Sequence, residues 1–504
     1  MNAILAIDLG TTALKCALYD PSGNVIAKAT EEYHLITPTA LSVEMDVETY
    51  WAAFKTAVRR ILKDSKVNPD DIRALGISAQ GETLILVDKD GKPIRRAIVW
   101  LDNRAQDEAT QLAEKFGNQA AYAITGQVSF VPTWPASKVL WLRHHEPHVM
   151  DRTDKFLLIE DYFLHRLTGE YVCEGSLVTS TCYWNFNTRQ WWPEMLDVLG
   201  IQAKQLPRYC ESGEPIGKLR VEIAEELGLS RNTVACTGAL DQACGAIGVG
   251  NIKPGIFSEN TGAALAICST VKQATLDPQH QMPCHYHGLP GLYMLHTFTS
   301  GGIVLRWFRD EFAQQEMSDA EANGTDAYDL LGMQAAQVLP GCEGLVMLPH
   351  LQGAMAPEAN PLAKGVFYGF TLRHGRNHFV RAIMEAVSYI VRRNIEVIER
   401  MGVAVSEVRS LGGGARSRIW KQIEADITGR IVLTTLNEEA ATLGAAILAG
   451  KAVGMFESVE EAAEQMVHIK ERFEPTPANA LVYNEAFKTY VQLYEALIPL
   501  FDQS

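Results

Sequence analysis

The fold of this chain is decided close to its N-terminus, by the stretch DLGTTALKC at Asp8–Cys16. The stretch lies between two apolar runs and predicts the tight turn of a β-hairpin. Gly10 lets backbone N–H groups approach an anion, and Thr11 and Thr12 add hydroxyl donors. The stretch therefore predicts a phosphate-binding turn. A hairpin tip with incidental polar residues is the alternative, and this stretch alone does not separate the two.

Asp8, the acidic residue at the start of the turn, is expected to bind a partner other than phosphate. A bare carboxylate repels phosphate, so Asp8 is expected to face a divalent cation rather than the phosphate itself.

Composition and charge exclude several classes of protein. A chain of 504 residues is too long for one hydrophobic core, so we expect at least two domains. A net charge of −15 argues against nucleic-acid binding, which needs a basic surface. None of the nine cysteines forms a CxxC pair, which suits a reducing cytosol. No signal-like segment and no membrane-length apolar run is present, so we expect a cytoplasmic protein without a membrane partner.

The first half of the chain predicts an α/β arrangement. Residues 3–31 predict three short strands, a helix follows from about Asp46, and residues 72–77 predict a buried strand. Further strands are expected at residues 84–87 and 97–100. The order βββαβ, with polar groups at strand ends, is typical of α/β folds that bind ligands at the carboxyl edge of the sheet.

Two later stretches repeat the logic of the opening turn. VACTGALDQACGA at residues 234–246 is an apolar strand, a glycine break, an acid and a helix of small residues. GIFSENTGAALA at residues 255–266 is a strand, a Thr-Gly turn and a strand. This repetition predicts two domains built on one design, which we place at residues 1–248 and 249–504. The tail from Ser458 predicts an amphipathic helix.

Phosphoryl transfer is the chemistry that these elements favour. The chain has no Walker-type G-x-x-x-x-G-K-[ST] and no G-x-G-x-x-G after its first strand, which argues against P-loop and dinucleotide folds. Phosphoryl transfer needs phosphate-cradling donors, a divalent ion and a carboxylate that deprotonates the acceptor hydroxyl. The expected donors are Thr11, Thr12 and Thr261. The ion contact is Asp8 and the base is Asp241.

Taken together, the motifs resemble those of the FGGY family of carbohydrate kinases, within the actin, hexokinase and Hsp70 superfamily. The resemblance runs from about residue 3 to about residue 450. Its motifs are DLGTT at 8–12, GALDQ at 238–242, NTG at 260–262 and LGGGARS at 411–417, with family signatures at 365–370 and around 138–142. Phe370 and Thr133 depart mildly from these signatures.

The resemblance implies an ATP-dependent kinase of two ribonuclease-H-like domains, the actin-like ATPase fold, with a cleft between them. It implies that Asp241 is the general base and that Asp8 holds Mg²⁺ through water. The residues implied for ATP are Thr11, Thr12, Lys15, Thr261 and Gly262 at the phosphates, with Gly302, Gly413 and Ser417 near the adenosine. The residues implied for the sugar or polyol are Gln80, Gly81, Glu82, Trp100, Asp102, Arg104, Asp241 and Gln242. A homo-oligomer, a dimer, is a further expectation from the resemblance.

The choice of acceptor substrate is limited by comparison with family members at residues 80–82, at Thr133 and at residues 100–104. Glycerol kinases of this family carry Arg-Glu where this chain has Gly81-Glu82, and a tyrosine where it has Thr133. Loss of the guanidinium removes bidentate donors, which weakens the case for glycerol. WLDNR at residues 100–104 fits a xylulokinase-like pattern better, although those kinases carry Met-His-Gly at residues 80–82. We expect a ketopentose or a linear polyol of about four to six carbons, with glycerol as the alternative.

A non-catalytic regulator and a zinc-binding site are two further interpretations of the sequence. A non-catalytic sugar- or nucleotide-binding regulator of the same superfamily would need a DNA-reading domain, and no such extension or basic patch is visible. A zinc site could use His280, Cys284, His285 and His287. No second ligand pair follows, so a surface loop is the preferred interpretation of this segment.

Overall fold

The opening hairpin forms as the sequence predicts. In the computed structural model, which describes residues 2–502, β1 (Ala3–Leu9) pairs antiparallel with β2 (Ala13–Tyr19). β2 in turn pairs with β3 (Val25–Glu32). β6 (Ile72–Ala79) runs parallel to β1 on the other side.

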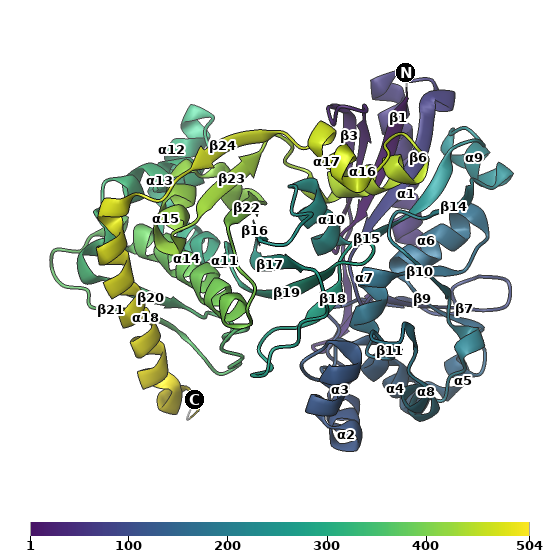
Figure 1. Ribbon diagram of the computed structural model, residues 1–504, viewed down its shortest axis with the longest axis horizontal. Helices are drawn as coiled ribbons and strands as arrows, with labels where there is room; N and C mark the ends of the chain where they lie inside the picture. Colours follow the sequence, from purple (N-terminus) through teal and green to yellow (C-terminus); the bar gives the residue numbers. More distant parts are fainter. Residues whose placement is uncertain (1, 503–504) are drawn as a thin grey trace. The chain divides into compact units, whose positions relative to one another are not determined.

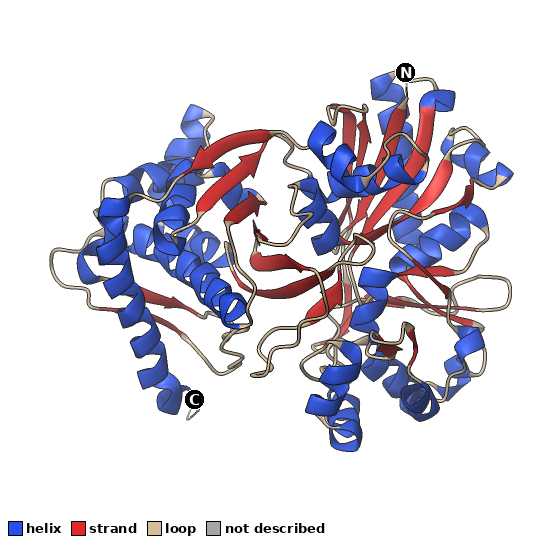
Figure 2. Ribbon diagram, in the orientation of Figure 1, coloured by secondary structure: helices blue, strands red, loops and turns tan. Residues whose placement is uncertain are grey.

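The chain divides into two units that alternate along the sequence. Unit 1 holds Met1–Ile252, Lys272–Met294 and Glu439–His468. Unit 2 holds Lys253–Val271, Leu295–Glu438 and Ile469–Ser504. The colours of Figure 1 follow the sequence and so show this alternation. Figure 2 shows helices packed beside the strands of each unit. The assignment of residues 1–248 and 249–504 to two domains stays a prediction.

The main sheet of unit 1 has six strands in the order β14-β15-β6-β1-β2-β3. β15 (Val234–Leu240) is parallel to β6, and β14 (Pro215–Lys218) is antiparallel to β15. Because β1, β6 and β15 are parallel, their carboxyl ends meet at one edge of the sheet. This edge carries Asp8, Gln80 and Asp241.

A second sheet of unit 1 has five strands in the order β4-β5-β8-β7-β9. They are β4 (Ile36–Thr39), β5 (Ser42–Met45), β8 (Ala97–Ile98), β7 (Leu84–Val87) and β9 (Lys155–Leu158). The prediction of β7 from the sequence is confirmed, whereas the predicted end of β8 at residue 100 is wrong. Trp100 instead lies in the turn after β8.

The helices of unit 1 cover these two sheets. α1 begins as predicted, since the Asp46 side chain accepts a hydrogen bond from the backbone of Glu48. The helices are α1 (Val47–Ser65), α2 (Gln106–Phe116), α3 (Asn118–Thr125), α4 (Pro135–His145), α5 (Pro147–Met150), α6 (Ile159–Thr168), α7 (Gly175–Val178), α8 (Pro193–Leu199), α9 (Val221–Leu227), α10 (Asp241–Gly248), α16 (Ala440–Ala452) and α17 (Val459–Met466). Short strands β10 (Val172–Glu174), β11 (Trp184–Asn185), β12 (Gln190–Trp191), β13 (Arg208–Cys210) and β18 (Cys284–Tyr286) complete the unit.

Helix α16 comes from the second half of the chain but packs inside unit 1, beside the N-terminal strands (Figure 1). A Cβ atom at Gly76 on β6 would lie 2.3 Å from the carbonyl oxygen of Ala445. A Cβ atom at Gly444 would lie 1.9 Å from the carbonyl oxygen of Cys244 on α10. Only glycine permits such close approach, so these positions fix α16 against β6 and α10.

Unit 2 repeats the strand order of unit 1. Its strands follow the order β19-β17-β16-β22-β23-β24, with β16 parallel to β22 and β22 parallel to β23. They are β16 (Ile256–Thr261), β17 (Ala264–Val271), β19 (Tyr293–Ser300), β22 (Glu407–Leu411), β23 (Ile431–Thr435) and β24 (Ile469–Phe473). The two sheets share even a register pair: Asp8 on β1 lies opposite Ser78 on β6, and Glu259 on β16 lies opposite Ser410 on β22.

The remaining elements of unit 2 are helical apart from a two-stranded sheet. They are α11 (Ile303–Phe312), α12 (Gln314–Asn323), α13 (Ala327–Ala336), α14 (Arg376–Arg400), α15 (Arg418–Thr428) and α18 (Ala480–Phe501), with β20 (Val346–Pro349) and β21 (Gly365–Tyr368). The predicted helical tail from Ser458 is wrong in part. β24 interrupts it, because these residues pair antiparallel with β23 and form the edge of the sheet.

Candidate active site

Asp8 is held in place at the end of β1 by its neighbours in the sheet. The Ser78 hydroxyl donates a hydrogen bond to Asp8 Oδ1 at 2.8 Å. Burial raises the pKa of the Asp8 carboxyl, and the charge of Glu439 adds to this, whereas the Ser78 hydrogen bond and Lys15 act in the opposite direction. Asp8 is therefore a partly buried acid whose surroundings, on balance, favour its neutral form.

Lys15 is tied to an acid in the structure. Its Nζ atom lies 2.8 Å from Glu439 Oε2, and Lys28 approaches the same carboxylate at 3.8 Å. Glu439 immediately precedes α16, so this ion pair joins the phosphate hairpin to that helix. The phosphate contact expected of Lys15 stays a prediction.

The tip of the hairpin contacts residues predicted for the acceptor. The indole Nε1 of Trp100 donates to Thr11 Oγ1 at 2.8 Å. The amide Nε2 of Gln80 lies 3.4 Å from the carbonyl oxygen of Gly10, which also accepts from the Tyr33 hydroxyl. The tip is therefore braced from two other segments of unit 1.

Asp241 is placed by a break in its strand. It is the first residue of α10, directly after β15. The register of β15 against β6 shifts between Cys236 and Ala239, which marks a β-bulge. A Cβ atom at Gly238 within it would lie 1.5 Å from the carbonyl oxygen of Ile77, so this position requires glycine. The bulge turns the chain so that the acid stands at the edge of the sheet.

The environment of Asp241 suits a general base. Burial, together with the charges of Asp8 and Glu82, raises the pKa of the Asp241 carboxyl to about 8, against hydrogen bonds from Gln242. The backbone N–H of Gln242 donates to Asp241 Oδ1 at 2.7 Å. A general base works best with a pKa near the operating pH. Two acids from distant segments of the sequence, Asp8 and Glu82, thus act on Asp241 in unit 1.

Two buried acids that the sequence analysis missed support the bulge. The backbone N–H of Gly238 donates to Glu160 Oε1 at 2.7 Å. The backbone N–H of Leu240 donates to Ser176 Oγ at 2.8 Å, and that hydroxyl donates to Glu174 Oε2 at 2.7 Å. These side chains lie on α6, α7 and β10, and no motif announces them.

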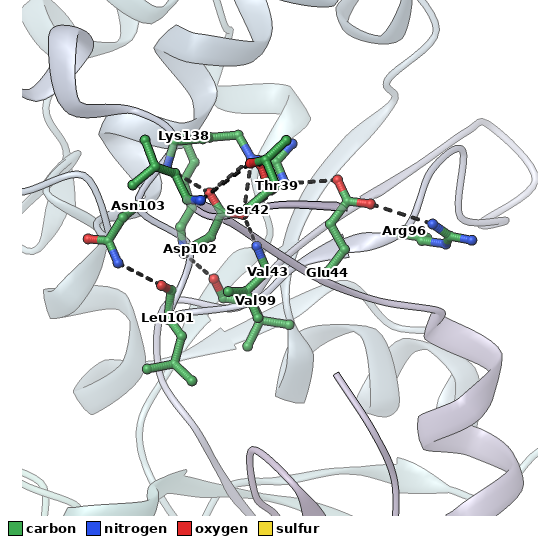
Figure 3. A network of polar contacts seen from close by, with 12 residues as sticks. Thr39, Ser42, Val43, Glu44, Arg96, Val99, Leu101, Asp102, Asn103 and Lys138 are labelled. Carbon is green, nitrogen blue, oxygen red and sulfur yellow. Dashed lines mark hydrogen bonds and ion pairs between the residues drawn. The ribbon is translucent and has the colours of Figure 1, made fainter. Parts of the chain in front are cut away.

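Asp102 and Arg104 form a closed network (Figure 3 shows Asp102). Asp102 is fully buried, and its Oδ2 atom accepts from the backbone of Val43 at 2.6 Å and from Arg104 at 2.8 Å. The Arg104 guanidinium also lies 2.8 Å from Glu44 Oε1 and 4.9 Å from the ring centroid of Trp141. Asp102 therefore orients Arg104. Glu44 lies on β5, a short strand that the sequence analysis does not predict, so this partner of Arg104 was missed.

Glu82 occupies a turn that favours glycine or asparagine. Its φ angle is 55°, in the left-handed region. Burial raises the pKa of its carboxyl, whereas a hydrogen bond with Ser180 and the charge of Lys138 act in the opposite direction. A Cβ atom at Gly81 would lie 3.0 Å from Leu240 Cδ1, so the turn lies beside the residue that precedes Asp241.

In unit 2, the predicted phosphate and adenosine motifs contact each other. The backbone N–H of Gly302 donates to the carbonyl of Gly262 at 2.8 Å. A Cβ atom at Gly414 would lie 2.6 Å from Thr261 Cγ2, so the glycine run packs directly on the Thr-Gly turn. Gly413 is exposed beside it. Ser417 accepts from the backbone of Trp420 and begins α15.

A buried charge network lies behind Thr261. Its hydroxyl donates to Glu259, which also accepts from Ser410. Lys421 Nζ lies 2.7 Å from Glu259 Oε1 and 2.5 Å from Glu424 Oε2, and all three charged side chains are buried. Lys421 thus neutralises the acid that occupies the position of Asp8 in the second sheet.

The segment weighed as a zinc site is not a surface loop, and that interpretation is wrong. Cys284 and His285 lie on strand β18, and both are buried together with His287. The apolar environment favours neutral imidazole, and burial lowers the pKa of His287 to about 4. Within residues 2–502, no three His, Cys, Asp or Glu side chains are grouped as a metal site would need.

Comparison with known proteins identifies the family. The N-terminal domain of the FGGY family of carbohydrate kinases matches residues 3–248, and its C-terminal domain matches residues 262–453. A xylulose kinase of Bacillus subtilis (strain 168) is 32% identical, over 98% of this chain and 97% of its own length. A gluconokinase of the same strain is 31% identical, over 98% and 96%.

Solved structures agree with this match. A ligand-bound xylulose kinase from Lactobacillus acidophilus has a TM-score of 0.91 at 27% identity, covering 100% of both chains. A glycerol kinase from Plasmodium falciparum, with ADP, has a TM-score of 0.87 at 21% identity, covering 98% of each chain, and shares the fold.

The two similar sheets with acids at their strand ends match solved kinases of the actin-like ATPase fold, which is the fold that the family resemblance implies. The chain belongs to the FGGY family of carbohydrate kinases. It is a phosphotransferase that acts on an alcohol group of a carbohydrate, and the family implies ATP as the donor. None of the helices between residues 2 and 502 combines the length and the apolar character needed to cross a bilayer.

Proposed function

We propose that this kinase transfers the terminal phosphoryl group of ATP to a hydroxyl of a ketopentose, or of a linear polyol of similar size, with Asp241 as the general base. The observation that carries the proposal is the placement of Asp241 at the head of α10, where Asp8 and Glu82 help to raise its pKa to about 8. The 32% identity with a xylulose kinase supports the ketopentose.

In this mechanism Asp241 accepts the proton of the attacking hydroxyl as the new oxygen–phosphorus bond forms, while the bond from the γ-phosphorus to the β,γ-bridging oxygen breaks and ADP leaves. The protonated carboxyl is tolerated because its surroundings already favour the neutral form. The bulge at Gly238 fixes the backbone that carries the carboxyl, so little reorganisation is needed at the moment of transfer.

The residues of this chain fit a divalent cation at Asp8. The charge of Asp8 raises the pKa of Asp241, so a cation beside them would offset their repulsion. We assign Mg²⁺ to Asp8, through water. When bound, the ion neutralises negative charge on the phosphoryl group that is transferred. Asp8 itself is oriented for this role by Ser78.

The other assignments follow the motifs. Phosphate contacts are assigned to Thr11, Thr12, Lys15, Thr261 and Gly262, and the adenosine to Gly302, Gly413 and Ser417. The acceptor is assigned to Gln80, Gly81, Glu82, Trp100, Asp102, Arg104 and Gln242. Residues 1–248 would thereby carry the acceptor and residues 249–504 the adenosine. The protein is expected to act in the cytoplasm as a homodimer.

One observation favours the polar groups around Gln80 as acceptor contacts. The side chain of Gln80 is buried, and its Oε1 atom has no hydrogen-bond partner among the described residues. A buried amide oxygen without a partner is costly, and a carbohydrate hydroxyl would satisfy it.

A panel of acceptors tests the proposal. Ketoses, alditols, aldonates and glycerol are compared by coupled ADP release at equal concentration. We expect the highest kcat/KM with a ketopentose or a linear polyol. Preferred turnover of an aldonate would favour a gluconokinase instead, as the 31% identical relative allows. Turnover of glycerol alone would contradict the proposal.

A further inference from the structure

A buried lysine lies behind the acceptor residues of unit 1. Lys138 on α4 has a side chain with no exposed surface. Its Nζ atom donates to the carbonyl oxygen of Glu82 at 2.9 Å and to the carbonyl oxygen of Val99 at 3.0 Å. Figure 3 shows the ammonium beside Val99 and Asp102.

The two carbonyls belong to the two segments that present the acceptor residues. One segment is the turn Gln80–Glu82, and the other runs from Val99 to Arg104. The backbone N–H of Trp100 also donates to Thr83 Oγ1 at 3.2 Å, so the segments are already adjacent. Lys138 is the cation that bonds to the main chain of both.

An ammonium at this position is costly, so packing alone does not explain it. Burial lowers the pKa of Lys138 to about 7, against the charges of Glu82 and Asp102, and Arg104 lowers it further. A methionine would fill a similar volume without the desolvation cost. The benefit must come from what the ammonium holds.

What it holds is a backbone in an unfavourable conformation. Glu82 has a φ angle of 55°, in the left-handed region that is unfavourable for a residue other than glycine. A charge-assisted hydrogen bond to its carbonyl oxygen favours this conformation. The turn lies against Leu240, the neighbour of Asp241, so its conformation sets where the Glu82 side chain stands relative to the base.

We propose that Lys138 is a positioning residue for the carbohydrate acceptor: its ammonium ties the left-handed turn at Glu82 to the segment that begins at Val99, and so fixes the Glu82 carboxylate and the indole of Trp100 for one acceptor. The inference rests on the proposed function, which assigns the acceptor to these two segments.

The test is a split between two Michaelis constants. Lys138→Met removes the ammonium and keeps the volume. We expect the KM for the best acceptor of the panel to rise about tenfold or more, as for a lost uniform-binding contact. We expect the KM for ATP to stay within about twofold, because Lys138 contacts no residue assigned to ATP.

Lys421→Met is the matched control, since it removes another fully buried ammonium, from unit 2. Lys421 acts through Glu259 on Thr261, so its loss should raise the KM for ATP and leave the KM for the acceptor near that of the wild type. A rise in both constants by the same factor in Lys138→Met would indicate a loss of general order and overturn the proposal. An unchanged acceptor KM in the folded variant would also overturn it.

Glu82→Gln separates this inference from the proposed function. If Glu82→Gln leaves the acceptor KM unchanged, the assigned acceptor site is wrong. If Glu82→Gln raises it and Lys138→Met does not, only the role of Lys138 is wrong. Should Lys138→Met fail to fold, the same constants are measured for Lys138→Gln, which keeps an amide donor. Failure of both variants to fold would show a purely structural lysine and overturn the proposal.

Discussion

Replacing Gly238 by alanine should disable catalysis while leaving most of the fold intact. The added Cβ atom would lie 1.5 Å from the carbonyl oxygen of Ile77, about 1.9 Å closer than the shortest ordinary van der Waals contact of 3.4 Å. No rotamer relieves a clash between Cβ and backbone. The strand must therefore shift by an ångström or more at the bulge, three residues before Asp241.

The size of this shift sets the expected effect. A misplacement of about 1 Å at a reacting group costs on the order of 10²-fold in rate. We expect kcat of Gly238→Ala to fall by at least about 10²-fold, and the KM for ATP to change little, because no residue assigned to adenosine adjoins the bulge. Coupled ADP release measures the first effect and a titration of ATP the second.

Gly217→Ala is the control for this experiment. Gly217 lies on β14 of the same sheet, and its added Cβ atom would meet only Thr168, at 3.7 Å. This variant should keep the activity of the wild type. A folded Gly238→Ala protein with undiminished kcat would refute the argument that the bulge aims the base.

Substitutions at three positions probe the general base and the residues that support it. Asp241→Asn should lower kcat by about 10²- to 10⁴-fold without loss of ATP binding, and should raise the thermal midpoint at pH 8. The midpoint should rise because the pKa of Asp241 in the folded protein is raised to about 8, so ionisation of this carboxyl destabilises the fold progressively as pH rises from about 4 to 8. An unchanged midpoint would argue against this pKa. Glu82→Gln removes a like charge, so the acidic limb of the kcat/KM profile should move to lower pH; a shift to higher pH would contradict the electrostatic account. Glu160→Leu should lower kcat because the N–H of Gly238 loses its acceptor, whereas Glu160→Gln keeps one and should remain near the wild type; equal loss in both would point to the charge instead.

The sequence predicts this fold well where the signal is local. The turn at Asp8–Cys16 and the glycine break before Asp241 are short, and each has a steric or chemical reason to be where it is. The register pair of Asp8 and Ser78 joins segments about seventy residues apart, and nothing in either segment announces it.

Contacts that depend on tertiary packing escaped prediction for the same reason. In the sequence Lys138 stands out only as part of a family signature, because an isolated lysine gives no sign that it is buried beside two carbonyls. The strands β4 and β5 have four residues each, too few for a clear alternation. The segment at Cys284–Tyr286 was misjudged because its polar residues are buried against distant parts of unit 1.

The placement of α16 has a consequence for how the chain folds during translation. Residues up to Ile252 are translated first. Helix α16, which covers β6 and α10, belongs to the last segment of unit 1, which ends at His468 and is translated later. The 200 residues from Lys253 to the end of α16 at Ala452 take about 10 to 40 s to translate at about 5–20 residues per second. During that interval the nascent first unit exposes glycine-lined backbone and apolar surface that α16 later covers. Unit 1 therefore cannot complete its packing until α16 has been translated.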